Sequence, residues 1–405
     1  MWIRTALAVL AGVLFLVLLT ARASIDYDEA PEIVAEERVR AEHKVRTEHR
    51  VHEVRRGDGY VMLDERFSVE DGAQLRVAVG DADVVVRHGP SGEVHMQIIA
   101  EAEDRDAARD YFERQHFRAG SENGGVYLTD APEKHNTRFS FRDRRHPSLR
   151  VEITAPERMD ADLRTSDGDL HVERFDGTVS LRTSDGDVYA EHLTGPAITL
   201  RTSDGDVRLE HAEAETVELQ TSDGDLSAEM IRAARFSART SDGDVHAARL
   251  VATDGAEVRT SDGDLRLGDV TAGRFSARTS DGDVVVDALT ATHSRIHTSD
   301  GNLALRRVAG ALEATGNDAD VHVGLSESTP LGDISIRLSD GDIVIDAPAD
   351  LTADLMLRGE DGVRVDRAYA FHGSVEKKRV EGRLGKGGAR LEARTSSGSV
   401  VLRNK

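Results

Sequence analysis

Aspartates at a regular spacing are the residues of this sequence that could do chemistry. The pentapeptide TSDGD occurs in seven identical copies, and TSDGN at Thr298 and LSDGD at Leu338 follow them. The seven copies begin at Thr165, Thr183, Thr202, Thr221, Thr240, Thr260 and Thr279. Carboxylate oxygens are the ligands that calcium prefers in proteins. If successive copies stack, their aspartates form two rows that could hold cations.

The candidate cation ladder consists of the two aspartates of each identical copy. Like charges ~4.8 Å apart repel by roughly 1 kcal/mol in water, so a favourable interaction must offset the repulsion within each row. Turn amides could bond the carboxylates, the arginine before each threonine could pair with them, or Ca²⁺ could bind between them as a cofactor. The first two offsets need no cofactor. The ladder residues are Asp167, Asp169, Asp185, Asp187, Asp204, Asp206, Asp223, Asp225, Asp242, Asp244, Asp262, Asp264, Asp281 and Asp283.

Alternating apolar residues on both sides of each copy predict the elements that position these aspartates. Leu181 and Thr183 precede one turn, and Val188 and Ala190 follow it, which predicts two short strands per repeat. Asp-Gly predicts a tight turn in which glycine supplies a positive φ, and a looser turn such as 191–196 closes the unit. A unit of about 19 residues cannot bury its apolar face alone. The sequence therefore predicts an all-β fold with a β-solenoid of such coils, and tandem antiparallel hairpins are the alternative.

The chain divides into four predicted parts. Residues 156–405 contain the repeats, and residues 60–155 predict a small β-rich head with one short helix over 104–116. Residues 24–59 are dense in mixed charge and predict a solvated stalk. Residues 1–23 combine Arg4, an apolar run and a small-residue site ending at Ala23, which predicts an export signal. Cleavage after Ala23 is favoured over an uncleaved inner-membrane anchor; either way this segment contacts the inner membrane during export, and the rest lies in the periplasm or on the cell surface.

A basic island in the head is a second candidate binding site. It could hold an anionic glycan, a lipid head group or an acidic partner. The alternative is that its arginines lie in water or pair with the acidic body. The island consists of Arg138, Arg142, Arg144, Arg145 and Arg150.

Composition excludes several classes of protein. The 405 residues include 52 Lys+Arg and 74 Asp+Glu, a net charge of −22 that argues against a nucleic-acid partner. The chain has no cysteine, which excludes disulfides, thiolate zinc sites and the acylated cysteine of a lipoprotein.

The repeats, the export segment and the closing pattern from Gly385 to Val400 resemble the bacterial DUF4097 family of β-strand-repeat proteins, which carry an adhesin label. The resemblance covers roughly residues 65–405. It implies an envelope location and a repetitive β architecture, and it brings no catalytic residues with it.

Three functions are consistent with these features. The first is a non-enzymatic, exported, adhesin-like repeat protein whose regular acidic surface binds or scaffolds an envelope protein or a glycan. The second is a calcium-dependent β-helix enzyme acting on polysaccharides. An enzyme needs a unique set of residues, whereas these carboxylates are copies of one another, and the sequence has no HExxH, GxSxG or P-loop motif. The third is an envelope-stress accessory protein that acts through the head.

Overall fold

A computed structural model describes residues 55–56, 59–131, 147–327 and 332–405. The predicted export signal and almost all of the predicted stalk lie outside the described residues. The described part is nearly all β, with 27 strands and one helix, which confirms the predicted fold class. Among the helices of the described residues, none has the length and apolar character needed to cross a membrane.

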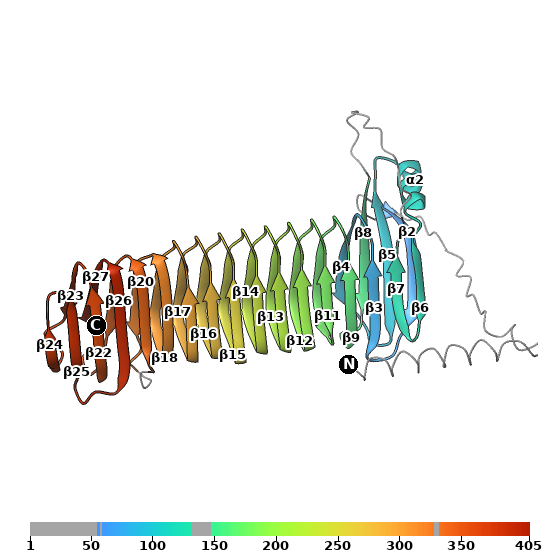
Figure 1. The fold of residues 1–405 in the computed structure, drawn as a ribbon. Helices are drawn as coiled ribbons and strands as arrows, with labels where there is room; N and C mark the ends of the chain where they lie inside the picture. Colours follow the sequence, from blue (N-terminus) through green and yellow to red (C-terminus); the bar gives the residue numbers. More distant parts are fainter. Residues whose placement is uncertain (1–54, 57–58, 132–146, 328–331) are drawn as a thin grey trace, which may run out of the picture. The chain divides into compact units, whose positions relative to one another are not determined.

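The repeats form a β-solenoid of about 10 turns of about 19 residues each (Figure 1). Neighbouring coils pair in parallel, and each residue lies beside the residue at the same motif position, as Val188 does beside Val207. The alternative of antiparallel hairpins is therefore wrong for the repeats. The strands of this region are β9 (Met159–Arg164), β10 (Leu170–Asp176), β11 (Val179–Arg182), β12 (Val188–Arg201), β13 (Val207–Gln220), β14 (Leu226–Arg239), β15 (Val245–Arg259), β16 (Leu265–Arg278), β17 (Val284–His297) and β18 (Leu303–Asp318).

Each coil from β12 to β18 is one long strand rather than the two short strands predicted. The strand runs through the predicted second turn, and the ladder to the next coil continues there, with Gly195 beside Ala214. The buried positions change phase along the strand, which shows that the strand bends around the core. The buried residues of β12 are Val188, Ala190, Leu193, Ile198 and Leu200. One strand thus supplies both faces of its coil.

The motif glycines allow close stacking and do not supply a positive φ. None of the motif glycines from Gly168 to Gly301 has a left-handed φ, so this part of the prediction is wrong. A Cβ on any of them would lie 1.9–2.1 Å from a carbonyl oxygen of the preceding coil. Glycine is required because the turns of successive coils touch through their backbones.

The motif threonines bind each turn to the one before it. They are buried, with exposed fractions of 1–8% in the seven identical copies. The hydroxyl of Thr240 lies 3.0 Å from the Ser222 carbonyl oxygen and 3.1 Å from that of Gly224, and it accepts the Gly243 N–H at 3.3 Å. Every copy repeats this arrangement, so the turns form a continuous hydrogen-bonded edge.

The head strands continue the solenoid. β3 pairs in parallel with β9, and β4 with β10, around a turn at Gly80 that resembles the motif turns. The predicted helix is confirmed as α2 (Arg105–Gln115), whose N-cap Asp104 accepts the Ala107 N–H and whose Ala108 is buried. The strands are β1 (Arg55–Arg56), β2 (Gly59–Ser68), β3 (Ala73–Ala78), β4 (Ala82–His88), β5 (Glu93–Glu101), β6 (Arg118–Glu122), β7 (Gly125–Thr129) and β8 (Ser148–Ala155).

The last strands do not stack in sequence order. β26 lies between β20 and β22, and β27 lies between β21 and β23. The C-terminal coil is therefore inserted between the coil of β20 and β21 and the coil of β22 and β23, which both come earlier in the chain. β24 and β25 then add antiparallel strands beyond β22. The strands are β19 (Val321–Leu325), β20 (Ile334–Asp340), β21 (Ile343–Ala347), β22 (Ala353–Gly359), β23 (Gly362–Val365), β24 (Phe371–Val375), β25 (Arg379–Leu384), β26 (Ala389–Ser397) and β27 (Ser399–Asn404).

Candidate functional site

The second aspartates of the motif form a continuous ladder of hydrogen bonds. Asp187 donates its backbone N–H to the carboxylate of Asp169 at 2.8 Å, and every later copy repeats this bond. The ladder runs from Asp83 to Ser399 with N–H to oxygen distances of 2.7–3.1 Å. Turn amides therefore offset the charge of this row, as one of the three predicted offsets requires.

The first aspartates of the motif are exposed in all eight copies from Asp167 to Asp300. In the part of the chain that the structure describes, their carboxylates form no hydrogen bond or ion pair. No group of three or more His, Asp or Glu side chains among the described residues is arranged to hold a metal ion. Calcium binding along the two rows stays a prediction, and the exposed first row is where it would occur.

The arginines before the motif threonines share one register row, and none of them pairs with a motif aspartate. Four of the six pair with strand residues, whereas Arg182 and Arg278 have no ion-pair partner among the described residues. Arg201 contacts Glu218 at 2.8 Å, and Arg239 contacts Glu257 at the same distance. A different arginine, Arg266, bridges the second aspartates of two coils, Asp244 at 2.8 Å and Asp264 at 2.6 Å.

The basic island lies almost entirely outside the described residues. Arg138, Arg142, Arg144 and Arg145 belong to segment 132–146, which the structure does not describe. Arg150 is on β8 and lies 3.3 Å from Glu101 of β5. Binding by the island stays a prediction.

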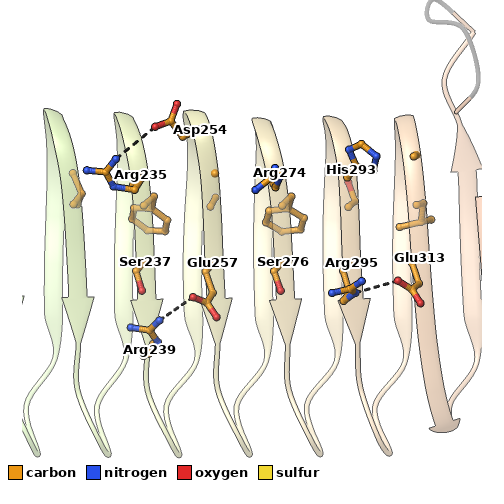
Figure 2. A pocket seen from close by; sticks show the side chains of 18 of the residues that line it. Arg235, Ser237, Arg239, Asp254, Glu257, Arg274, Ser276, His293, Arg295 and Glu313 are labelled. Atoms are coloured by element: carbon orange, nitrogen blue, oxygen red, sulfur yellow. Dashed lines mark hydrogen bonds and ion pairs between the residues drawn. The ribbon is translucent and has the colours of Figure 1, made fainter. Parts of the chain in front are cut away.

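An open groove of about 1010 Å³ lies on one face of the solenoid, a site that the sequence reasoning did not find. It crosses the second halves of β13 to β18 and ends on β20, from Thr216 at one end to Arg337 at the other. Figure 2 shows Arg235, Ser237 and Arg239 along β14, with Arg274 and Ser276 at the matching positions of β16. We call this site the central groove.

The central part of this face carries positive charge in an acidic protein. The outward positions of β14 to β17 on this face hold six arginines against the two acidic residues Asp254 and Glu257. Arg235 lies 3.6 Å from Asp254, and Arg295 lies 3.0 Å from Glu313 of the next coil. The six arginines are Arg235, Arg239, Arg259, Arg274, Arg278 and Arg295. Arg259 and Arg278 lie outside the groove lining, which over its whole length holds five arginines and five acidic residues, so the excess of positive charge is confined to the central part of the face.

Three serine hydroxyls that line the central groove have no hydrogen-bond partner. Ser237 and Ser335 occupy outward positions of their strands, and Ser294 occupies a core position. Ser294 lies between Phe275 and Leu312 in the register and is only 5% exposed. Ser180 of β11 has the same buried, unpaired hydroxyl and does not line the groove, so this feature is not specific to the groove.

Irregular strand pairing accompanies the groove. The register shifts between Ala233 and Arg235, between Ala252 and Ala256, and between Ala291 and His293. β15 has 15 residues where its neighbours β14 and β16 have 14, and the extra residue belongs to the Thr253–Asp254 segment. Bulges often lie next to functional sites. The sequence signal for this bulge is the interval of 20 residues between Gly243 and Gly263.

A polar cluster holds the inserted C-terminal coil. Asp346 of β21 lies 2.8 Å from the Arg403 guanidinium of β27 and 2.6 Å from His322 Nε2 of β19. Burial raises the pKa of Asp346, but hydrogen bonds from Arg403 and His322 outweigh it and lower that pKa below the ordinary value. The Asp346 carboxylate is therefore held ionised between Arg403 of β27 and His322 of β19.

Comparison with known proteins agrees with this architecture. The family model described as Toastrack DUF4097 matches residues 73–250 and again residues 233–403. The chain belongs to this family. The first Toastrack match begins at the first residue of β3, where the first coil begins. None of the curated proteins matches the chain.

The solved structures that match this Toastrack chain are only distantly similar to it. A "putative adhesin" from Parabacteroides merdae has a TM-score of 0.33 and 11% identity over 70% of this chain and 95% of its own. Another from Parabacteroides distasonis has a TM-score of 0.33 and 12% identity over 72% and 98%. A "putative lipid binding protein" from Parabacteroides distasonis has a TM-score of 0.30 and 14% identity over 66% and 94%. These names belong to those proteins and carry no argument about this one.

Proposed function

We propose that this chain is a non-enzymatic, adhesin-like binding protein of the bacterial envelope. The central groove supports this proposal, since it is an open, extended surface that crosses seven neighbouring strands. At about 4.8 Å per strand it is roughly 30 Å long, which suits a ligand that contacts several coils at once.

The acidic residues of the groove support binding rather than catalysis. Glu257 and Glu313 are paired with Arg239 and Arg295, respectively. Each of these carboxylates is already engaged by a guanidinium group, whereas a glycosidase needs one carboxyl group free to reach the glycosidic oxygen. The proposal therefore disfavours the polysaccharide-active enzyme.

The experiment applies the purified protein to immobilised neutral and acidic polysaccharides and measures both retention and the release of new reducing ends. We expect retention on at least one polymer without cleavage of any. Cleavage would instead support the enzyme, and retention on none would contradict a glycan-binding adhesin.

Export is the second part of the proposal, and the sequence of residues 1–23 supports it. Expression in a bacterium with a periplasm, followed by fractionation and mass spectrometry, tests it. We expect an exported chain that begins at Ser24. A full-length chain in the inner membrane would favour the anchor, and a full-length chain in the cytosol would contradict export.

A further inference from the structure

We propose that the central groove binds a linear acidic polysaccharide, through the arginines of its central part and the Ser276 hydroxyl. This inference rests on the proposed binding function and names the ligand class.

Two unpaired arginines of β16 carry the inference: Arg274 lines the groove, and Arg278 lies on the same outward face just beyond the groove lining. Arg274 and Arg278 on β16 lie on either side of Ser276, and all three face outward between buried residues. Within the described residues neither arginine has an ion-pair partner, whereas Arg235, Arg239 and Arg295 nearby are paired. Two free guanidinium groups on one strand provide strong donors for carboxylate or sulfate oxygens.

A serine between the two arginines supplies a further contact. Ser276 lines the groove, and its hydroxyl has no hydrogen-bond partner among the described residues and is not one of the fully buried hydroxyls. Sugar hydroxyls both donate and accept hydrogen bonds, as serine hydroxyls do, so a sugar chain in the groove can bond Ser276.

The shape of the positive region favours a single polymer chain over an anionic membrane. The arginine row ends at the motif turns, where Arg278 is followed by the exposed Asp281 two residues beyond Thr279. A row of such carboxylates borders the groove along the solenoid and would repel an extended anionic plane. A chain lying within the groove meets Arg235 of β14 and Arg274 of β16, roughly 10 Å apart on alternate coils, and avoids the acidic edge.

The aromatic residues of the groove disfavour single-stranded nucleic acid. Such ligands bind by stacking their bases on exposed aromatic rings. Phe236 and Phe275 line the groove but are only 3% and 2% exposed, respectively. An acidic polysaccharide needs no such platform because ion pairs and hydrogen bonds hold it.

The test compares the purified full chain with two charge-reversal variants. Arg274→Glu changes an unpaired arginine of the groove. Arg232→Glu is the matched control, because Arg232 is an exposed arginine of β14 that does not line the groove. Circular dichroism melting checks that both variants fold.

Binding is measured to polygalacturonate, heparin, neutral dextran, anionic phospholipid vesicles and single-stranded DNA. We expect the wild-type protein to bind polygalacturonate or heparin, and the stronger of the two identifies carboxylate or sulfate as the preferred group. Arg274→Glu should weaken this binding about tenfold, whereas Arg232→Glu should change it less than twofold. Added salt should weaken binding by the wild-type protein, because it screens the ion pairs.

Four results would overturn the inference. Equal binding to dextran, or binding that Arg274→Glu leaves unchanged, would show that groove charge does not select the ligand, while the proposed binding function would stand. Binding to vesicles or DNA without binding to either acidic polysaccharide would assign another partner class. Retention on no polymer would remove the proposed glycan-binding function together with this inference.

Discussion

The carboxylate of Asp225 accepts a hydrogen bond from the backbone N–H of Asp244, the residue at the same motif position one coil later, at 2.8 Å. The second aspartate of each TSDGD copy is therefore a structural acceptor between coils. The first aspartate of the same turn, Asp223, is exposed and has no such bond. Two residues of one type in one motif thus have different roles, and this difference can be measured.

Replacement of the second aspartate should destabilise the solenoid, whereas replacement of the first should not. We expect Asp225→Ala to lower the free energy of unfolding by about 1 kcal/mol, because the Asp244 N–H loses its charged acceptor. Asp223→Ala should change it by less than about 0.5 kcal/mol. Asp225→Asn should fall between them, since Asn302 already accepts the Asp320 N–H in the natural chain. Urea unfolding followed by circular dichroism measures all three, and equal effects of the two alanine variants would contradict the assignment.

A methyl group on a motif glycine should separate the coils. The Cβ of Gly243→Ala would lie 1.9 Å from the Gly224 carbonyl oxygen, so we expect a loss of about 3 kcal/mol or more. The control is Gly255→Ala, whose Cβ would come no closer than 3.4 Å to any atom. It should cost less than about 1 kcal/mol. Thermal melting of both variants tests this, and a similar loss from both would show that stacking distance does not explain the motif glycine.

Calcium binding by the aspartate ladder predicts a specific rise in melting temperature. If Ca²⁺ bridges the exposed first row, the melting temperature in calcium exceeds that in EDTA and that in an equal concentration of magnesium. A variant with alanine at Asp204, Asp223 and Asp242 should reduce this rise. Equal melting temperatures in all three conditions would assign the aspartates to turn structure alone.

The stabilising effect of Asp346 should depend on pH. Its pKa is lowered in the folded chain from the ordinary value of 3.8, so its contribution is fully present above that value. The contribution is lost as the pH falls from about 4 through the lower folded pKa. We expect Asp346→Asn to lower the melting temperature at neutral pH, and the difference from wild type to shrink near pH 3. A difference that stays constant with pH would contradict a role for the ionised carboxylate.

The sequence predicted the solenoid because the same alternation of apolar residues and the same turn recur in every repeat. Val207 and Leu209, two alternating apolar residues of one repeat, are both buried, as the pattern requires. The predicted role of the motif glycines was wrong, because Asp-Gly is also typical of hairpin turns and local sequence does not report the distance between coils. The groove was missed because its residues come from seven strands of successive coils and lie outside the TSDGD motif.

The sequence by itself determined that the chain is a stack of short β coils with one aspartate-rich turn each, since period and turn chemistry are local properties. Only the tertiary structure decided which aspartate row is bonded, because the acceptor of each amide lies in another coil. It also placed Ser399 beside Asp342. The C-terminal coil therefore stacks before the coil that contains Gly362, although Gly362 comes earlier in the chain. Stacking order and the central groove both depend on contacts between separate coils, and no local pattern encodes those contacts.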